Sequence, residues 1–369
     1  MGARRKLLLG IGGLAAIALF ASPWIAWRAQ RPRTMDVVIV DKTVPFESYR
    51  EHAGIPWILH AMKIQQPGGR FLEPARDYVG FDPKTKTGHD LTDAHLAHAD
   101  VLVIADTYGV YRGDYERPGD QAALERSPKI YGGLSNDEAR AVASFWERGG
   151  LVLAEFNTFA SPTPPPAREM LERVFGVRWT KWVARYWPNL QDPNEVPRWL
   201  ARAWERITHT PFDMRGGGLV FVREDEDIVV LLDGEDLDAD VVRQVRTPRG
   251  ASFDLPPSGG FWLWMDVVEA TDGEVLYEHV VATTAAGQHK LARHGLPVRF
   301  PALTKHRDAW YFAGDFVDTA MDLGSPERYG LIPWRARTTG CGGGSTADDG
   351  SFWGFYAPIV ERLFSSRAR

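Results

Sequence analysis

The chain has 369 residues, of which 44% are hydrophobic and 25% charged, enough for a sizeable core in one large domain or two ordinary ones. A net charge of −5 argues against a polyanion such as a nucleic acid as the partner. The single cysteine, Cys341, excludes an internal disulfide and a cluster of thiolate metal ligands within one chain.

The first 34 residues are predicted to form a membrane anchor and a short linker. After MGARRK, the 21 residues from Leu7 to Trp27 carry no charge, and about 20 apolar residues cross a bilayer as a helix. We therefore predict a single-pass signal anchor, residues 7–27, in a bacterial cytoplasmic membrane, with the globular part outside the cytoplasm. A cleaved twin-arginine export signal at Arg4 and Arg5 is an alternative. An inverted anchor is another, because positive charge flanks the apolar run on both sides.

Residues 35–217 are predicted to form an α/β domain. Three apolar runs predict buried strands: MDVVIVD ends at Asp41, VLVIAD ends at Asp106, and GLVLAEFNTF ends in Glu155 and Asn157. Residues 47–63 have helical spacing, and SNDE at residues 135–138 is a capping box that begins another helix. Strands that alternate with helices predict a flavodoxin-like, mostly parallel sheet flanked by helices.

The pattern changes in the second half of the chain. An aromatic strand at 177–187 and an amphipathic helix at 194–207 complete the α/β domain. Residues 218–300 then contain strands separated by Asp-Gly, Gly-Gly and Pro-Pro turns, which predicts an antiparallel β-rich insertion. Residues 301–369 are predicted to return to the α/β domain with a strand at 306–316, which ends in Asp315, and a closing helix.

The carboxyl edge of the parallel sheet is the predicted site, because ligands of open α/β sheets bind there. Asp41, Asp106 and Glu155 are candidates for acid and base catalysis, since burial at a strand end shifts pKa values. The alternative interpretation is structural, because carboxylates often stand where a chain leaves the core. The candidate ligand-binding residues are Lys42, Tyr49, Arg50, His52, Tyr108, Tyr111, Asn157, Arg185, Tyr186 and Asp315.

We predict neither a metal site nor a cofactor. The histidines and aspartates between His89 and Asp100 are residue types that bind zinc or manganese. No second set of ligands follows them, and a polar turn explains them as well. The sequence also lacks a P-loop, a dinucleotide-binding glycine motif after a strand, a His-Glu-x-x-His motif and a Gly-x-Ser-x-Gly elbow.

Several segments resemble the class I glutamine amidotransferase-like superfamily, and a group of uncharacterised membrane-anchored bacterial proteins. They are VVIVDKTVP, YREHAGIPWIL, VLVIADTYGVY, IYGGLSNDEA, LVLAEFNTFASPT and WYFAGDF, in this order. The superfamily's activity requires a cysteine nucleophile on a tight turn after a strand, paired with a histidine. Asn157 and Thr158 stand at the corresponding turn here. The resemblance therefore implies the family's cleft without its glutaminase chemistry.

Three functions are consistent with these features, and whether the chain is an enzyme is left open. The first is a non-catalytic envelope protein that binds a glycan, a peptide or a protein partner at the carboxyl edge. The second is a carboxylate-dependent hydrolase acting on an envelope polysaccharide, which requires two carboxyl groups about 5–5.5 Å or about 6.5–9.5 Å apart in a groove. The third is an accessory subunit of a membrane complex.

Overall fold

The computed structural model describes residue 18 and residues 20–49, 52–116, 126–225, 227–239, 242–253, 255–256, 259–316, 323–339 and 350–369. Arg50, Cys341 and most of the predicted membrane segment 7–27 lie outside these residues. The helices are α2 (Gly54–Ala61), α3 (Pro74–Asp77), α4 (Asp93–Leu96), α5 (Gly113–Glu116), α6 (Asn136–Glu147), α7 (Pro165–Phe175), α8 (Arg198–Thr208), α9 (Pro248–Ala251), α10 (Ala285–Arg293), α11 (Leu331–Thr339), the π-helical turn η3 (Phe352–Tyr356) and α13 (Ala357–Ser365).

The strands form two large sheets and two small strand pairs within the described residues. The strands are β1 (Arg33–Thr34), β2 (Val37–Asp41), β3 (Ile64–Gln65), β4 (Tyr78–Asp82), β5 (Thr87–Gly88), β6 (Val101–Asp106), β7 (Val110–Tyr111), β8 (Lys129–Tyr131), β9 (Leu151–Ala154), β10 (Val177–Trp187), β11 (Gly218–Arg223), β12 (Ile228–Leu232), β13 (Val242–Arg246), β14 (Gly260–Phe261), β15 (Met265–Ala270), β16 (Glu274–Val280), β17 (Arg299–His306) and β18 (Ala309–Phe312).

The larger sheet has the strand order β14-β13-β16-β17-β18-β9-β6-β2-β4-β5. Its centre is parallel: β18 pairs with β9, β9 with β6, β6 with β2, and β2 with β4. In chain order these five strands are arranged 2-1-3-4-5, which is the flavodoxin-like order. The α/β class and the parallel centre predicted from the sequence are therefore confirmed, and antiparallel strands extend this sheet at both edges.

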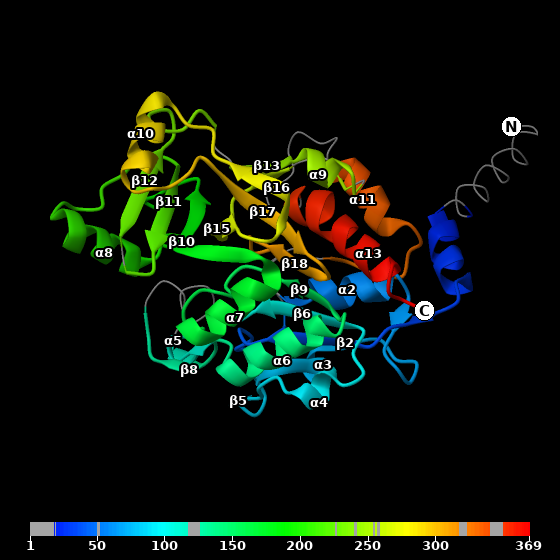
Figure 1. Ribbon diagram of the computed structural model, residues 1–369. Coiled ribbons are helices and arrows are strands. Elements are labelled where there is room, and N and C mark those ends of the chain that lie inside the picture. The colour runs from blue at the N-terminus through cyan, green and yellow to red at the C-terminus, as the bar shows by residue number, and fades with distance from the viewer. Residues whose placement is uncertain are drawn as a thin grey trace, which may run out of the picture.

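Helices cover both faces of the parallel centre, and strand alternation decides which residues each helix meets. One face, with Ile39, Val103 and Leu153, packs against α2, η3 and α13. The other face, with Val40, Ile104 and Ala154, packs against α4, α6 and α7. Figure 1 shows this three-layer arrangement in the part of the molecule that holds β2, β6 and β9. The predicted capping box is present at the start of α6, where Ser135 and Glu138 bond to each other's backbone N–H.

The segment 218–300 supplies strands to both sheets. β11 and β12 form a hairpin that joins β10 and β15 in an antiparallel sheet of order β12-β11-β10-β15. β13, β14 and β16 instead extend the larger sheet. The strands at 265–270 and 274–280 had the pattern of a hairpin, but β15 pairs with β10 and β16 pairs with β13 and β17. Their turn thus passes the chain from one sheet to the other.

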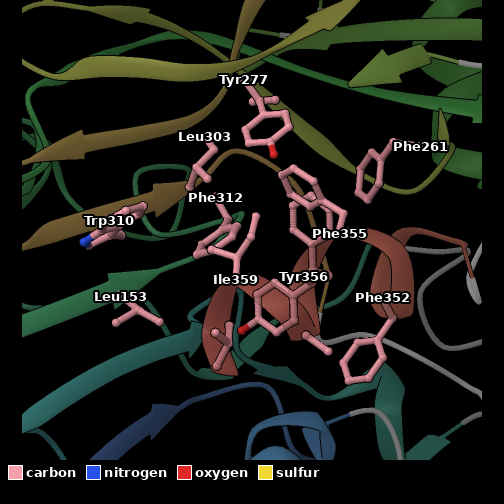
Figure 2. Packing of buried hydrophobic residues seen from close by; sticks show 14 of the residues in the cluster. Leu153, Phe261, Tyr277, Leu303, Trp310, Phe312, Phe352, Phe355, Tyr356 and Ile359 are labelled. Atoms are coloured by element: carbon pink, nitrogen blue, oxygen red, sulfur yellow. The ribbon is translucent and has the colours of Figure 1, made fainter. Parts of the chain in front are cut away.

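The C-terminal segment closes the larger sheet with aromatic side chains. Figure 2 shows Phe312 from β18 beside Phe355 and Tyr356 from η3. The ring centroids of Phe312 and Tyr356 are 5.1 Å apart, and those of Tyr277 and Phe355 are 4.8 Å apart, both in edge-on arrangements. Large, stiff rings fill this layer, so the C-terminal segment is a structural part of the α/β domain.

Residues 20–29 form a helix at the N-terminal end of the described chain. Its Trp27 is buried, and the indole Nε1 donates to the carbonyl of Ala61 at 3.1 Å. Each helix in the described part of the chain is too short or too polar to span a bilayer. The predicted linker is ordered from residue 28 to residue 34, because β1 pairs with β3 and Thr34 exchanges two backbone hydrogen bonds with Arg369.

Candidate functional site

Strands β2, β6 and β9 end side by side at one edge of the sheet. Asp41 stands opposite Asp106 in the β2–β6 pairing, and the backbone N–H of Glu155 donates to the carbonyl of Ile104 at 3.2 Å. The three predicted carboxylates therefore lie on neighbouring strand ends. Their side chains nevertheless have different partners, and these partners decide what each carboxylate can do.

Asp41 and His52 form a buried pair at the end of β2. The Asp41 Oδ2 atom is 2.7 Å from His52 Nδ1, and both side chains are buried. Asp41 Oδ1 accepts the backbone N–H of Thr43 at 3.1 Å. The backbone carbonyl of His52 accepts the hydroxyl of Tyr78. A carboxylate beside Nδ1 fixes the orientation of an imidazole ring, so this pair holds the His52 ring in place at the end of β2.

Asp106 lies next to this pair. The pKa of its carboxyl group is raised from 3.8 to about 6, mainly by burial; His52 acts to lower this pKa and the carboxylate of Asp41 acts to raise it. Its Oδ1 accepts the backbone N–H of Tyr108 at 2.6 Å, and Thr43 donates a side-chain hydrogen bond to it. A carboxyl group with a pKa near 6 exchanges protons near neutral pH, as acid–base catalysis requires.

Lys42 lies on the opposite face of the sheet from Asp41, as alternation along β2 requires. Its Nζ is 2.7 Å from the carboxylate of Glu138, 2.9 Å from the carbonyl of Gly133 and 3.3 Å from Asp90 Oδ1. It also lies over the ring of Tyr131, at 4.6 Å from the centroid. Lys42 and Glu138 are both buried. The ammonium group of Lys42 joins β2 to α6, and its hydrogen bonds are made to other groups of the protein.

Glu155 points into the aromatic layer under η3. Its Oε1 accepts the hydroxyl of Tyr356, and its Oε2 accepts the backbone N–H of Phe316 at 3.2 Å. Burial raises the pKa of Tyr356 well above 10, and the carboxylate of Glu155 adds to this shift. Glu155 thus ties the C-terminal segment to the end of β9.

Asn157 has a left-handed backbone, with φ of +71°, in the turn after β9. Its carbonyl accepts the hydroxyl of Thr107 at 2.8 Å, and its N–H donates to Asp266 Oδ2 at 3.3 Å. Asp266 also accepts the hydroxyl of Tyr311. Burial raises the pKa of Asp266 to about 7, and the hydrogen bond from Tyr311 acts in the opposite direction. Asp266 comes from β15, so it links the two sheets beneath the turn.

A pocket of about 190 Å³ opens between β4 and α3. Asp41 and His52 do not line it, but they contact two of its lining residues: Asp41 pairs with Gly80 in the sheet, and the carbonyl of His52 accepts the hydroxyl of Tyr78. Tyr49 and Tyr78 form its aromatic wall, with ring centroids 5.9 Å apart in an edge-on arrangement. Burial is the main reason why the pKa of Tyr49 is raised, and nearby carboxylates add to the shift. The residues that line the pocket are Tyr49, Pro74, Ala75, Arg76, Tyr78, Gly80, Phe81, Asp82 and His89.

The other predicted ligand-binding residues lie apart from the Asp41–His52 pair, and Arg185 and Tyr186 stand on β10 of the four-stranded sheet instead of at the carboxyl edge of the parallel sheet. The rings of Tyr108, which follows β6, and Tyr111, in β7, are tilted against each other with centroids 4.8 Å apart, and Tyr108 is exposed. Arg185 pairs with Glu195 at 3.2 Å. The Tyr186 hydroxyl donates to Asp233 Oδ2 at 2.7 Å.

Asp315 lies beyond β18, with its backbone N–H bonded to the carbonyl of Trp264 at 2.9 Å. Arg50 lies outside the described residues. The edge therefore brings Asp41, His52, Asp106 and Tyr49 together. Lys42 and Glu155 instead connect the strand ends to other elements, Lys42 to α6 and Glu155 to η3. No group of three residues able to hold a metal ion is found among the described residues.

Sequence reasoning missed Asp266, Tyr78 and Tyr311. Asp266 has a local signal, since it is the single charged residue of the apolar run FWLWMDVV. A charged side chain inside a buried strand costs free energy unless it is paired or neutral, so its position marks a polar partner across the core. Tyr78 and Tyr311 carry no such signal, because tyrosine is common in strands.

Comparisons with other proteins give low similarity. The sequence matches no known protein family and no curated protein. Among solved structures, a glutamine amidotransferase from Thermotoga maritima is 9% identical, with 89% of this chain and 97% of that chain covered and a TM-score of 0.38. A putative ThuA-like protein from Bacteroides uniformis is 11% identical, with 78% and 85% covered and a TM-score of 0.35.

A β-galactosidase from Bacillus circulans sp. alkalophilus is 12% identical, with 77% of this chain and 30% of that chain covered and a TM-score of 0.31. The chain spans about a third of the length of the glycosidases that it matches. The assignment of the parallel centre as flavodoxin-like therefore rests on the strand order of the sheet itself.

Proposed function

We propose that the chain is a membrane-anchored protein of the bacterial cell envelope whose amidotransferase-like α/β domain binds a small polar ligand without changing it chemically. The anchor is residues 7–27, and the globular part lies outside the cytoplasm. The ligand is a single sugar ring or the end of a short peptide. The pocket beside Asp41 and His52 carries this proposal.

The lining of the pocket suits such a ligand. Tyr49 and Tyr78 offer aromatic surface, and Arg76, Asp82 and His89 offer charged or polar groups. At about 190 Å³, the pocket is smaller than the roughly 300–1,000 Å³ of a site for a drug-sized molecule. It therefore accepts one ring or one or two side chains, and a longer glycan or peptide would extend into solvent.

The partners of the carboxylates support a binding role over hydrolysis. Glycoside hydrolysis needs two carboxyl groups that face the same bond. Glu155 is buried and held by Tyr356 and the backbone of Phe316. Asp41 is held by His52 and the backbone of Thr43. The turn after β9 has Asn157 in place of a nucleophile.

Hydrolysis of an envelope polysaccharide is the second candidate, and Asp106 is the reason to test it. Its pKa of about 6 is that of a general acid, and Asp41 is a second carboxyl group beside it. A hydrolase of this kind would release reducing ends from envelope polysaccharide with an acidic pH optimum, and Asp106→Asn would abolish the release. Equal release by the wild type and this variant would refute this candidate.

Binding can be tested with the full chain in detergent, by saturation-transfer NMR against monosaccharides and short peptides from envelope polymers. We expect either the monosaccharides or the short peptides to bind. Tyr49→Leu and His89→Ala should each weaken the affinity for that ligand about tenfold, or roughly 1.4 kcal/mol, because contacts in the pocket are lost. His98→Ala is the matched control, because His98 is an exposed histidine outside the pocket. Equal affinity in all three variants would show that the ligand binds elsewhere.

A further inference from the structure

The N-terminal helix and the segment around α11 carry an exposed aromatic surface. We call it the junction patch, and its residues are Phe20, Trp24, Ile25, Tyr329 and Trp334, all of which are exposed by 45% or more. Figure 1 shows the N-terminal helix and α11 at the same end of the molecule, far from α8. Single exposed apolar residues are common, whereas a group of them indicates an interaction surface.

The helix at 20–29 is fixed to the domain, so the junction patch is a rigid surface. The Nζ of Lys63 donates to the carbonyls of Trp27, Arg28 and Gln30, at 3.0, 2.8 and 2.7 Å. These bonds satisfy carbonyls that the last turn of a helix leaves unpaired, and they place a cation at its negative end. Trp27 itself is buried against the domain.

A second set of contacts joins the helix to the loop before α11. The backbone N–H of Tyr329 donates to the carbonyl of Pro23 at 2.9 Å, and Arg28 pairs with Glu327 at 3.3 Å. The two parts of the junction patch are therefore connected directly, although about 300 residues separate Arg28 from Glu327 in the sequence.

The two segments that carry the patch are rich in arginine. Residues 20–34 and 323–339 together contain six arginines and one acidic residue, Glu327. The arginines are Arg28, Arg31, Arg33, Arg328, Arg335 and Arg337. Tryptophan and tyrosine concentrate at the headgroup level of membranes, and arginine near a bilayer is attracted to anionic lipids. This composition matches a lipid surface better than a protein surface.

We infer that the junction patch lies on an anionic bilayer surface and holds the domain in one orientation. Phe20, Trp24 and Ile25 belong to the carboxyl-terminal end of the proposed anchor, residues 7–27, so the anchor would bring this end of the molecule to the headgroups. The inference rests on the proposed anchoring and adds a second contact, made by α11. The domain is then docked on the membrane instead of swinging on a linker.

The test uses the full chain with Cys341→Ser, reconstituted in vesicles of phosphatidylglycerol and phosphatidylcholine. A single cysteine for an environment-sensitive fluorophore is placed by Trp334→Cys or Tyr329→Cys. Ile207→Cys on α8 is the matched control, because Ile207 is also an exposed apolar residue and α8 lies at the other end of the molecule. Circular dichroism selects variants with native secondary structure.

We expect lipids with a nitroxide at the headgroup to quench most of the fluorescence at positions 334 and 329 and to leave position 207 unchanged. Replacing the anionic lipid by phosphatidylcholine should reduce the quenching. Vesicle flotation separates the two proposals. A chain that does not float refutes the anchoring, and the docking with it. A chain that floats with unquenched label at 334 and 329 refutes the docking alone.

Discussion

The buried carboxyl group of Asp266 should make the stability of the fold depend on pH. The folded protein raises the pKa of this group from 3.8 to about 7, chiefly by burial. Between these two values the folded state binds a proton that the unfolded state releases. Stability therefore falls as pH rises through this range, because the folded state must either keep the proton or bury a charge.

The magnitude follows from the two pKa values. A shift of about three units corresponds to roughly 4 kcal/mol, at about 1.4 kcal/mol per unit. The loss of stability accrues between pH 3.8 and about pH 7, and about two of these pH units lie above pH 5. Asp266 alone should therefore lower the free energy of unfolding by about 2–3 kcal/mol between pH 5 and pH 8. Asp266→Asn keeps a side-chain acceptor for the hydroxyl of Tyr311 and has no proton to lose.

The assay is urea unfolding, followed by tryptophan fluorescence at pH 5 and pH 8, for the wild type and Asp266→Asn. All other groups titrate in both proteins, so the difference between the two pH dependences isolates Asp266. We expect the variant to lose about 2–3 kcal/mol less than the wild type on going from pH 5 to pH 8. Asp137→Asn, at an exposed carboxylate, should leave the wild-type pH dependence unchanged. Parallel profiles for the wild type and Asp266→Asn would refute the assignment of a neutral buried carboxyl group.

Two further substitutions test the contacts that frame the site, again by urea unfolding. Lys42→Met should cost about 3–5 kcal/mol, because it leaves the buried carboxylate of Glu138 without its cation. Lys129→Met, at an exposed lysine, should change the free energy of unfolding little. A similarly small loss in Lys42→Met and Lys129→Met would mean that the Lys42–Glu138 pair is solvated. Gly80→Ala should cost about 4 kcal/mol or more, because its Cβ would stand 1.7 Å from a backbone oxygen of β2. Gly68 also has a positive φ but open space around it, so Gly68→Ala should cost only about 1–2 kcal/mol. Equal losses at both glycines would exclude the close approach of β4 to β2 as the cause.

Local sequence patterns were sufficient to predict the central strands and the start of α6. Apolar runs such as VLVIAD bury both faces of a strand wherever a domain forms around them, and a capping box satisfies backbone donors within four residues. The opposite orientations of Asp41 and Lys42 also follow from alternation along one strand. These features depend on neighbours in the chain, so one sequence is enough to predict them.

The partners of the polar groups could not be predicted in the same way. Glu155 and Tyr356 are 201 residues apart, and no local pattern connects them. The turn at 271–273 likewise gave no sign that β15 and β16 enter different sheets, because the signal of a tight turn is the same in both cases.

The sequence by itself determined that buried strands place carboxylates at one edge of a parallel sheet. Only the tertiary structure decided which partner each carboxylate meets: Asp41 pairs with His52, whereas Glu155 is held by Tyr356 and the backbone of Phe316. The physical reason is that burial and pairing are properties of the assembled layers. Asp106 keeps a raised pKa beside Asp41 and His52, whereas Glu155, one strand away, is held under the aromatic layer of the C-terminal segment.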